Sequence, residues 1–467
     1  RVEAGREVFR VACTRCHTTT GVNGVVRRLT RLYGAGAWDR DTVKAYLASM
    51  HTARPFMPPA PGSDVELGAL ADYLLSLQGQ PLALEGAQVV FITVGTPPQA
   101  DGSADTRAIY EVADVIAKHL DGYQLVVQKS TAPVGTARHL RDYIAKRAKR
   151  GARFDVASNP EFLRQGAAIE TFMHTDRVVI GAESRRAADT LKKIYAPLFL
   201  LETPTVVTTL ESAELIKYAS NCFLATKISF INEIANLCEA LGADVQAVAR
   251  GLGMDRRIGS KFLHAGPGYG GSCFPKDTLA LSAMGRAAGV ATGIVDATIA
   301  ANRNQTRLMV EKIVRGLGRP ARGAVVAMLG LAFKPDTDDL RAAPSLEIIA
   351  GLKRRGVKVR AFDPVAMPRA RVLSGLRDVV FAKDAYDCAR GADALVIVTE
   401  WNEFRNLGLA RLKRLMRRPV LCDLRNVYAP AEVEAAGFRH IGVGRGAAGA
   451  PTTASRRGTR RPRRKKP

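Results

Sequence analysis

The sequence has no run of about 18 apolar residues, the minimum from which a membrane-spanning helix is recognised, so we expect no membrane span. It also has no charged-then-apolar leader before Gly5, although a start at Arg1 rather than Met indicates a fragment or a processed chain. Cysteine is scarce: the seven residues are scattered and odd in number, which argues against a disulfide framework. A reducing compartment therefore fits most of the chain.

Acidic residues are outnumbered, because 44 Asp and Glu against 69 Lys and Arg give a formal charge of +25. Many of the cations lie in the final stretch "RRGTRRPRRKKP". Clustered cations release counterions from phosphate, so nucleic-acid binding is one interpretation. No aromatic or structured reader accompanies the stretch, so we expect a disordered basic tail at 445–467 and no nucleic-acid partner.

The hydrophobic pattern changes along the chain. Residues 1–79 carry short helical patterns around Gly- and Pro-rich connections, which predicts a small all-α domain. From 80 to 205, β-like runs such as "YQLVVQKS" and "RVVIGA" alternate with amphipathic helices, which predicts a parallel α/β sheet. Residues 206–310 are predicted to be helical, with one long buried helix, and 320–444 show a second α/β alternation.

Near the start of the chain, Cys13, Cys16 and His17 form the pattern C-x-x-C-H. Two thiols at this spacing can bond to the vinyl groups of haem, while the adjacent imidazole ligates the iron. We interpret Cys13 and Cys16 as haem attachment residues and His17 as an iron ligand.

A second iron ligand is expected downstream. "RPFMPPAPG" places Met57 between prolines, ahead of a terminal helical pattern. Residues 1–79 resemble a small c-type cytochrome domain, and this resemblance implies Met57 as the sixth ligand of a haem c. Met50 and His51 are weaker candidates, because they fall on a helical pattern whose apolar face explains Met50.

The stretch "GYGGSCFPKD" places Cys273 after flexible glycines and close to Lys276 and Asp277. A nearby cation favours the thiolate, and glycines let a substrate approach the backbone, so Cys273 is a candidate nucleophile. The other cysteines after residue 200 lie inside apolar patterns and are interpreted as packing residues: Cys222, Cys238, Cys388 and Cys422.

Six motifs occur in one order between about 82 and 444: "VGTPP", "STAPVGT", "NPEFLRQG", "ELIKYASN", "DRRIGSKFLHAGPGYGGSCFPKD" and "GLAFKPDTDDLR". In this order they resemble the UDP-glucose 6-dehydrogenases. The ending F-P-K-D after the cysteine resembles these enzymes more than the GDP-mannose or UDP-N-acetylmannosamine dehydrogenases, which remain alternatives.

The resemblance implies an α/β fold with an incomplete N-terminal Rossmann-like NAD domain, a central helical domain and a C-terminal Rossmann-like UDP-binding domain. It implies oxidation of the C6 alcohol of UDP-glucose to a carboxylate with two NAD. Cys273 would capture the intermediate aldehyde as a thiohemiacetal and carry it on to a thioester. A homodimer through the long central helix is also expected.

Residue roles follow from the same motifs. The implied catalytic residues are Cys273, Lys217, Asn221, Asp277, Glu161 and Thr131. The implied substrate contacts are Phe162, Leu163, Arg257, Phe262, Gly270, Lys276 and Lys334, with Arg257 reaching across from a neighbouring subunit. The implied NAD contacts are Val94, Thr96, Pro97, Ser130, Thr131 and Arg341.

Two of these residues share a helix face. Lys217 and Asn221 lie four positions apart, so both side chains can point at a developing oxyanion. At Gln165 the family commonly has a carboxylate, and an amide cannot take a proton, so no acid or base role is expected there.

One expected motif is lacking. A dinucleotide site needs a strand, a tight glycine turn and a helix, with an acidic residue roughly 20 positions on. The G-x-G-x-x-G strings from Gly266 and from Gly444 do not follow a strand and open a helix. The cytochrome-like segment occupies the place of this unit, so we expect weak NAD binding and slow turnover.

The two halves also imply different compartments: a haem-loaded cytochrome would be periplasmic, whereas NAD and UDP-sugars are cytoplasmic. Two hypotheses compete with a working dehydrogenase. One is a cytochrome for electron transfer joined to a non-catalytic sugar-nucleotide module, and the other is an accidental joining of two genes.

Overall fold

The computed structural model describes residues 43–44, 86–199 and 203–446. The described chain divides into two compact units. The first holds the described residues up to Cys222 together with 276–293 and 368–374. The second holds 223–275, 294–367 and the described residues from Gly375 onward.

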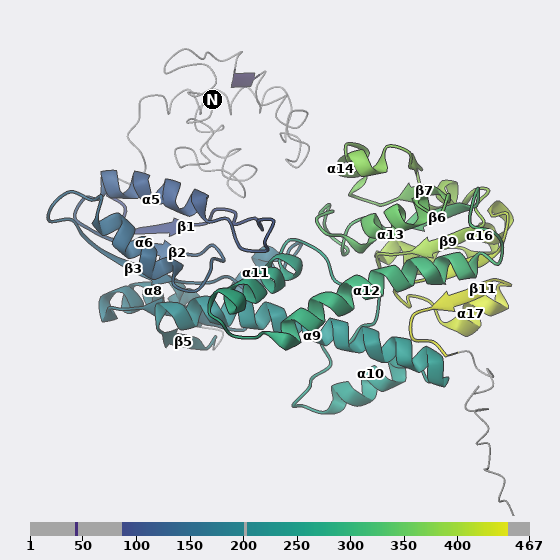
Figure 1. Ribbon diagram of the computed structural model, residues 1–467, viewed down its shortest axis with the longest axis horizontal. Coiled ribbons are helices and arrows are strands. Elements are labelled where there is room, and N and C mark those ends of the chain that lie inside the picture. The colour runs from purple at the N-terminus through teal and green to yellow at the C-terminus, as the bar shows by residue number, and fades with distance from the viewer. Residues whose placement is uncertain (1–42, 45–85, 200–202, 447–467) are drawn as a thin grey trace, which may run out of the picture. The chain divides into compact units, whose positions relative to one another are not determined.

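The first unit is built on a five-stranded sheet in the order β1-β2-β3-β4-β5 (Figure 1). Its strands are β1 (Val89–Ile92), β2 (Tyr123–Gln128), β3 (Arg153–Ser158), β4 (Val178–Ala182) and β5 (Thr205–Thr208). Its helices are α5 (Arg107–His119), α6 (Thr136–Ala145), α7 (Ala168–Met173) and α8 (Arg185–Phe199).

Alternation along the strands gives this sheet two separate apolar faces. Val126 of β2 packs in one cluster with α5 and α6, whereas its neighbours Leu125 and Val127 pack in another with α8. Figure 1 shows α5 and α6 on one side of the sheet and α8 on the other. The expected parallel pairing is confirmed for most pairs, but β4 runs antiparallel to β3.

Four long helical elements follow: α9 (Leu210–Leu241), α10 (Val245–Met254), α11 (Phe274–Ala287) and α12 (Gly293–Gly316). The single long helix expected from the sequence is confirmed as α9. Asp244 caps α10 by accepting a hydrogen bond from the backbone N–H of Gln246. Within the described ranges, no helix is both long and apolar enough to cross a membrane.

The second unit carries a six-stranded sheet in the order β11-β10-β9-β6-β7-β8. Its strands are β6 (Val325–Leu329), β7 (Lys358–Phe362), β8 (Val380–Phe381), β9 (Ala394–Ile397), β10 (Val420–Asp423) and β11 (Arg439–Gly442), all parallel. The helical segments are α13 (Pro344–Lys353), α14 (Met367–Arg371), η2 (Ser374–Leu376), α15 (Ala385–Ala389), η3 (Asn402–Asn406), α16 (Leu409–Leu415) and α17 (Pro430–Ala435).

This order is the doubly wound one, in which the direction of winding reverses between β6 and β9. Ligands of such sheets bind outside the carboxyl ends of the strands at this point. The expected Rossmann-like organisation of the C-terminal half is therefore confirmed, and its carboxyl edge is where a ligand is to be sought.

Candidate active site

Helix α9 presents two buried polar side chains on one face of the first unit. Lys217 is 4% exposed and donates from Nζ to Oε1 of Glu161 at 3.1 Å. One turn later, Asn221 is 7% exposed and donates from Nδ2 to Oδ2 of Asp277 at 2.6 Å. Burial of a lysine is costly unless it is paired, so these contacts mark a built polar site.

The carboxylate of Asp277 is fixed through both of its oxygens. Asp277 lies in the first turn of α11, where the helix dipole stabilises a negative charge. Besides the bond from Asn221, its Oδ1 accepts a hydrogen bond from Nζ of Lys276 at 2.6 Å. Lys276, predicted to contact substrate, is thus a partner of Asp277.

The turn after β3 carries the other carboxylate. Oε2 of Glu161 accepts the backbone N–H of Leu163 at 2.5 Å. The ring of Phe162 lies under Arg177, 3.8 Å from its guanidinium carbon, and 5.3 Å from Nζ of Lys217. The predicted residues of the motif "NPEFL" therefore do come together with Lys217.

The predicted NAD contacts of the first unit lie at the carboxyl ends of β1 and β2, which are parallel neighbours. The hydroxyl of Thr96 donates to the backbone oxygen of Thr131 at 2.6 Å, and that of Ser130 donates to the backbone oxygen of Val94 at 2.7 Å. These bonds join the two loops into one platform, and Pro97 is exposed beside it. The carboxyl ends of parallel strands are where α/β sheets bind their ligands.

In the second unit, Cys273 is exposed and ends a loop of close backbone contacts. Gly271 has φ +85°, and its N–H donates to the backbone oxygen of Arg341 at 2.9 Å. A Cβ on Gly270 would collide with the backbone oxygen of Ala342. Glycine is therefore required here by the close approach of the backbone segments.

The Cys273 loop lies near a guanidinium group. Arg341 forms an ion pair with Asp339 at 2.7 Å. The pKa of Arg341 is raised, chiefly by the hydrogen bond to Asp339 and to a smaller extent by Cys273. Sequence reasoning named Lys276 as the cation near the thiol and gave Arg341 to NAD, whereas the structure brings Arg341 within electrostatic reach of Cys273.

Three further residues were predicted to contact substrate. Phe262 and Lys334 belong to segments close to the Cys273 loop, and Arg257 follows α10. Phe262 has φ +65°, a strained conformation for an aromatic residue of the kind that gathers at functional sites. Lys334 lies over the ring of Phe333, and that ring approaches Gly271. Arg257 is exposed and pairs with Asp255 at 2.6 Å, so its guanidinium group is accessible from solvent.

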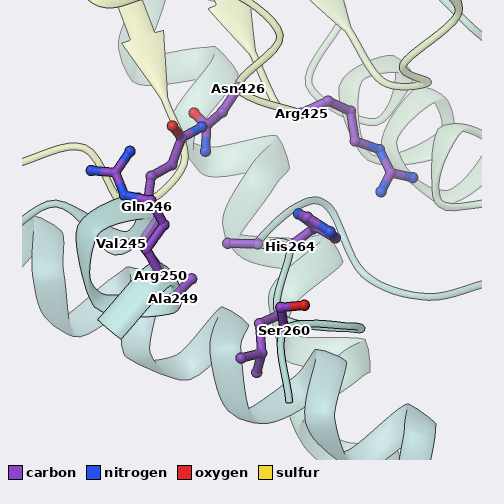
Figure 2. A pocket seen from close by; sticks show the side chains of 10 residues that line it. Val245, Gln246, Ala249, Arg250, Ser260, His264, Arg425 and Asn426 are labelled. Carbon is purple, nitrogen blue, oxygen red and sulfur yellow. The ribbon is translucent and has the colours of Figure 1, made fainter. Parts of the chain in front are cut away.

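A pocket of about 330 Å³ opens in the second unit beside the carboxyl end of β10 (Figure 2). Figure 2 shows side chains from α10, the 260–265 segment and the loop after β10 around it. Its lining includes the basic residues Arg250, His264 and Arg425. Arg425 is held by the backbone oxygens of Val398, at 2.8 Å, and Phe333, at 3.3 Å.

Sequence reasoning missed Arg425 and His264. The signal for Arg425 is its place in "DLRN", directly after the apolar run that forms β10, because a loop residue at the carboxyl end of a parallel strand is a ligand-binding position. His264 lies in a quoted motif, but nothing in its neighbours distinguishes it from a structural histidine.

The structure thus brings the predicted residues together in two groups. The first unit gathers Glu161, Lys217, Asn221, Lys276 and Asp277. The second unit holds Cys273, Gly270, Phe262, Lys334, Arg341 and Arg257. The haem residues Cys13, Cys16, His17 and Met57, and the alternatives Met50 and His51, lie outside the described residues.

Domains of two protein families match the chain. The NAD binding, central and UDP binding domains of the UDP-glucose/GDP-mannose dehydrogenase family match residues 71–199, 211–304 and 327–430. The cbb3-type cytochrome c oxidase subunit III matches residues 1–74, which confirms the cytochrome-like character of this segment.

Individual relatives agree with these matches. The chain is 50% identical over 366 residues to a UDP-glucose 6-dehydrogenase of Rhizobium meliloti, covering 78% of this chain and 83% of the relative. A UDP-glucose dehydrogenase from the archaeon Pyrobaculum islandicum superposes with a TM-score of 0.72 at 36% identity, covering 86% and 90% of the two chains.

A more distant structure, a UDP-D-ManNAc dehydrogenase from Pyrococcus horikoshii, gives a TM-score of 0.67 at 26% identity, covering 87% of this chain and 92% of that one. The fold, the motif residues and the extent of the identity lead to one conclusion. The chain belongs to the UDP-glucose/GDP-mannose dehydrogenase family.

Proposed function

We propose that the chain oxidises UDP-glucose to UDP-glucuronate with NAD. The observation that carries this proposal is the pair of buried contacts on α9, Lys217 with Glu161 and Asn221 with Asp277. A cation and an amide one turn apart suit a developing oxyanion, and each has a carboxylate that can handle protons or water. The 50% identity to a UDP-glucose 6-dehydrogenase supports this substrate over other sugar nucleotides.

The residues at the carboxyl ends of β1 and β2 would hold the nicotinamide side of NAD: Val94, Thr96, Pro97, Ser130 and Thr131. When bound, NAD supplies the acceptor for the two hydrides that the overall oxidation removes. The sequence given ahead of β1 carries no G-x-G-x-x-G string of the kind that forms the pyrophosphate turn. We therefore expect weak NAD affinity, and nanomolar or low-micromolar binding in calorimetry would contradict this expectation.

Cys273 is assigned the covalent step. Its Sγ adds to the C6 aldehyde to give a thiohemiacetal, and the second oxidation leaves a thioester on the same sulfur. Water then attacks the thioester carbonyl, the carboxylate product leaves, and the thiol is restored. Lys217 and Asn221 stabilise the oxyanion, while Asp277, Glu161 and Thr131 position or deprotonate the water.

The test is NADH formation by the full chain with UDP-glucose. Cys273→Ser should abolish glucuronate formation, whereas Cys238→Ala, a change at a buried cysteine in α9, should leave it unchanged. GDP-mannose and UDP-N-acetylmannosamine serve as competing substrates. Absence of NADH with all three would favour the alternative of a non-catalytic sugar-nucleotide module joined to a cytochrome.

The substrate nucleotide is assigned to the carboxyl edge of the second sheet. Lys334 follows β6 and Arg425 follows β10, both at the carboxyl edge of this sheet, and their cationic groups suit phosphate oxygens. Phe162, Leu163, Phe262, Gly270 and Lys276 are assigned to the sugar and its surroundings, and Arg257 to a neighbouring subunit's substrate.

A homodimer through α9 is part of the proposal. Phe223, Phe230 and Leu237 recur every seven residues on α9, followed by Leu241, and these side chains are between 47% and 66% exposed. An exposed apolar stripe with this spacing suits packing against a second copy of the helix. Phe230→Glu should shift sedimentation from dimer to monomer, and an unchanged sedimentation coefficient would contradict this interface.

The match at residues 1–74 favours a second function, electron transfer through a covalent haem c held by Cys13, Cys16, His17 and Met57. Intact mass spectrometry tests it, because haem attachment adds the mass of haem and Cys13→Ser with Cys16→Ser removes it. We place the dehydrogenase part in the cytoplasm, where NAD and UDP-sugars occur, and a haem-loaded segment in the periplasm.

A further inference from the structure

Lys129 is a half-buried lysine of the first unit that lies outside the groups described above. It directly follows β2, and its Nζ donates to Oδ1 of Asn159 at 3.1 Å and to the hydroxyl of Tyr195 at 3.1 Å. Partial burial takes the ammonium group out of some of its water, so its charge gains from a nearby anion. The question is which anion compensates it.

Asn159 connects Lys129 to the turn that carries Glu161. Both ends of its amide are engaged: Oδ1 accepts from Lys129 and from Tyr195, and Nδ2 donates to the backbone oxygen of Val179 in β4 at 2.8 Å. Its backbone N–H donates to the oxygen of Gln128, the last residue of β2, at 3.0 Å. The start of the Asn159–Pro160–Glu161 turn is therefore fixed by bonds from three elements, of which Lys129 supplies the charged one.

A small cavity of about 30 Å³ adjoins this network and is lined by Lys129, Asn159, Glu161, Arg177 and Tyr195 among others. Space of about 10–15 Å³ suffices for one water if polar partners are present. The cavity therefore has room for one water that could bridge Lys129 and Glu161, two side chains that need not touch each other directly.

Electrostatics connect the same residues. Burial lowers the pKa of Lys129 to about 8, while Glu161 raises it and Lys217 lowers it by smaller amounts. The charged or titratable groups around Lys129 are Glu161, Arg177 and Tyr195, which line the same cavity, and Lys217, which acts on it electrostatically. Burial raises the pKa of Tyr195 to about 12, so its hydroxyl keeps its proton well above the range in which Lys129 titrates.

We propose that Lys129 is a positioning residue for Glu161: its ammonium group fixes the Asn159–Pro160 turn and gives the Glu161 carboxylate a second positive charge beside Lys217. The catalytic meaning of this arrangement rests on the proposed function, in which Glu161 handles a proton or water. The physical coupling between Lys129 and Glu161 does not depend on that function, so the two can be tested separately.

The coupling is tested by a double-mutant cycle on urea unfolding of the full chain, with Lys129→Met, Glu161→Gln and the double variant. Loss of the Glu161 charge leaves the Lys129 charge less compensated. The change in urea midpoint caused by Lys129→Met should therefore be more stabilising, or less destabilising, in the Glu161→Gln variant than in the parent. Equal shifts in both backgrounds would overturn the proposal. Lys193→Met, at an exposed position on α8, is the matched control and should be additive.

The functional part is tested by kcat against pH with UDP-glucose. Lys129→Met should lower kcat by about tenfold near neutral pH with little change in KM, and the ratio of parent to variant should narrow as Lys129 loses its charge above about pH 8. Lys129→Gln, which keeps a donor to Asn159 without the charge, serves where Lys129→Met fails to fold and should show the same narrowing.

If the ratio of kcat between parent and Lys129→Met stays constant with pH, Lys129 has only a structural role. That result would overturn the proposal that its charge acts on Glu161. If the parent oxidises no sugar nucleotide, the proposed function fails, while the double-mutant cycle still decides whether Lys129 and Glu161 are coupled.

Discussion

The side-chain amide of Asn221 donates to the carboxylate of Asp277 at 2.6 Å, and this bond joins the middle of α9 to the first turn of α11. Asp277 is 1% exposed, so the bond is formed away from bulk water. Buried charge-assisted bonds of this kind are stronger than neutral ones and cost the most when one partner is lost. The two helices that carry the predicted catalytic side chains are fixed to each other at this point.

Asn221→Asp should turn this bond into a repulsion. Two buried carboxylates in contact cannot both ionise, so one would bind a proton more tightly in the folded than in the unfolded chain. Stability from that proton is present at low pH and lost as pH rises, so the unfolding midpoint of the variant should fall between about pH 5 and about pH 8.

Asn221→Leu provides the control for this experiment, since it removes the bond without adding charge. Its unfolding midpoint, relative to the parent, should stay nearly constant over the same pH range. If the unfolding midpoint of Asn221→Asp, relative to the parent, does not change with pH, the side chains at 221 and 277 are not in contact in solution.

Lys217→Met should lower kcat for UDP-glucose by about 10²–10³-fold, the usual cost of removing one oxyanion donor. The side chain keeps its length, so the packing of α9 is retained, and the lost interaction is the charge beside Glu161. Steady-state NADH formation measures the effect. A loss confined to KM would assign Lys217 to ground-state binding instead.

Arg425→Gln should weaken binding of UDP by about 10- to 100-fold, as expected for loss of a hydrogen bond to a charged group. Arg425 lines the pocket beside β10, and its guanidinium group is pre-positioned by the backbone oxygens of Val398 and Phe333 and by an ion pair with Glu400 at 3.0 Å. Calorimetry with UDP alone separates this effect from NAD binding. Arg411→Gln, on the exposed face of α16, is the control and should bind UDP as the parent does.

Much of the fold was predictable because apolar residues repeat with a different period along a strand, where every second residue faces the core, than along a helix, where the period is about 3.6 residues. The alternation around β2 and the unbroken apolar pattern of α9 depend only on local sequence, and both elements lie where the pattern placed them. The antiparallel pairing of β3 with β4 was missed, because strand direction depends on how the chain returns to the sheet through α7.

The candidate site was predictable where motif residues lie close in the chain and hard to predict elsewhere. The spacing of Lys217 and Asn221 already placed both on one face of a helix. The partners Glu161 and Asp277 are each 56 positions away from these residues, and only the tertiary fold shows which carboxylate meets which donor. Arg425 and Lys129 were missed because their environments come from other strands.

Glu214, one turn before Lys217 on α9, should make stability depend on pH. It is buried and accepts the backbone N–H groups of Gly135 and Ala137, the latter within the first turn of α6, at 2.6 and 2.7 Å. Burial raises its pKa to about 7 in spite of these donors. A raised pKa means that the folded chain holds this proton more tightly than the unfolded chain, so the contribution to stability is full below about pH 4.5 and is lost as pH rises through about 7.

Glu214→Gln has no proton to lose, so the unfolding free energy of the parent relative to this variant should fall by up to about 3 kcal/mol between about pH 5 and about pH 8. Urea unfolding at several pH values measures this difference. Glu183→Gln, at the surface and paired with Arg138 and Arg141, is the matched control and should show a much smaller dependence, because surface ion pairs contribute little. If the difference in unfolding free energy between the parent and Glu214→Gln does not change with pH, the two backbone donors outweigh burial and hold the Glu214 carboxylate ionised across this range.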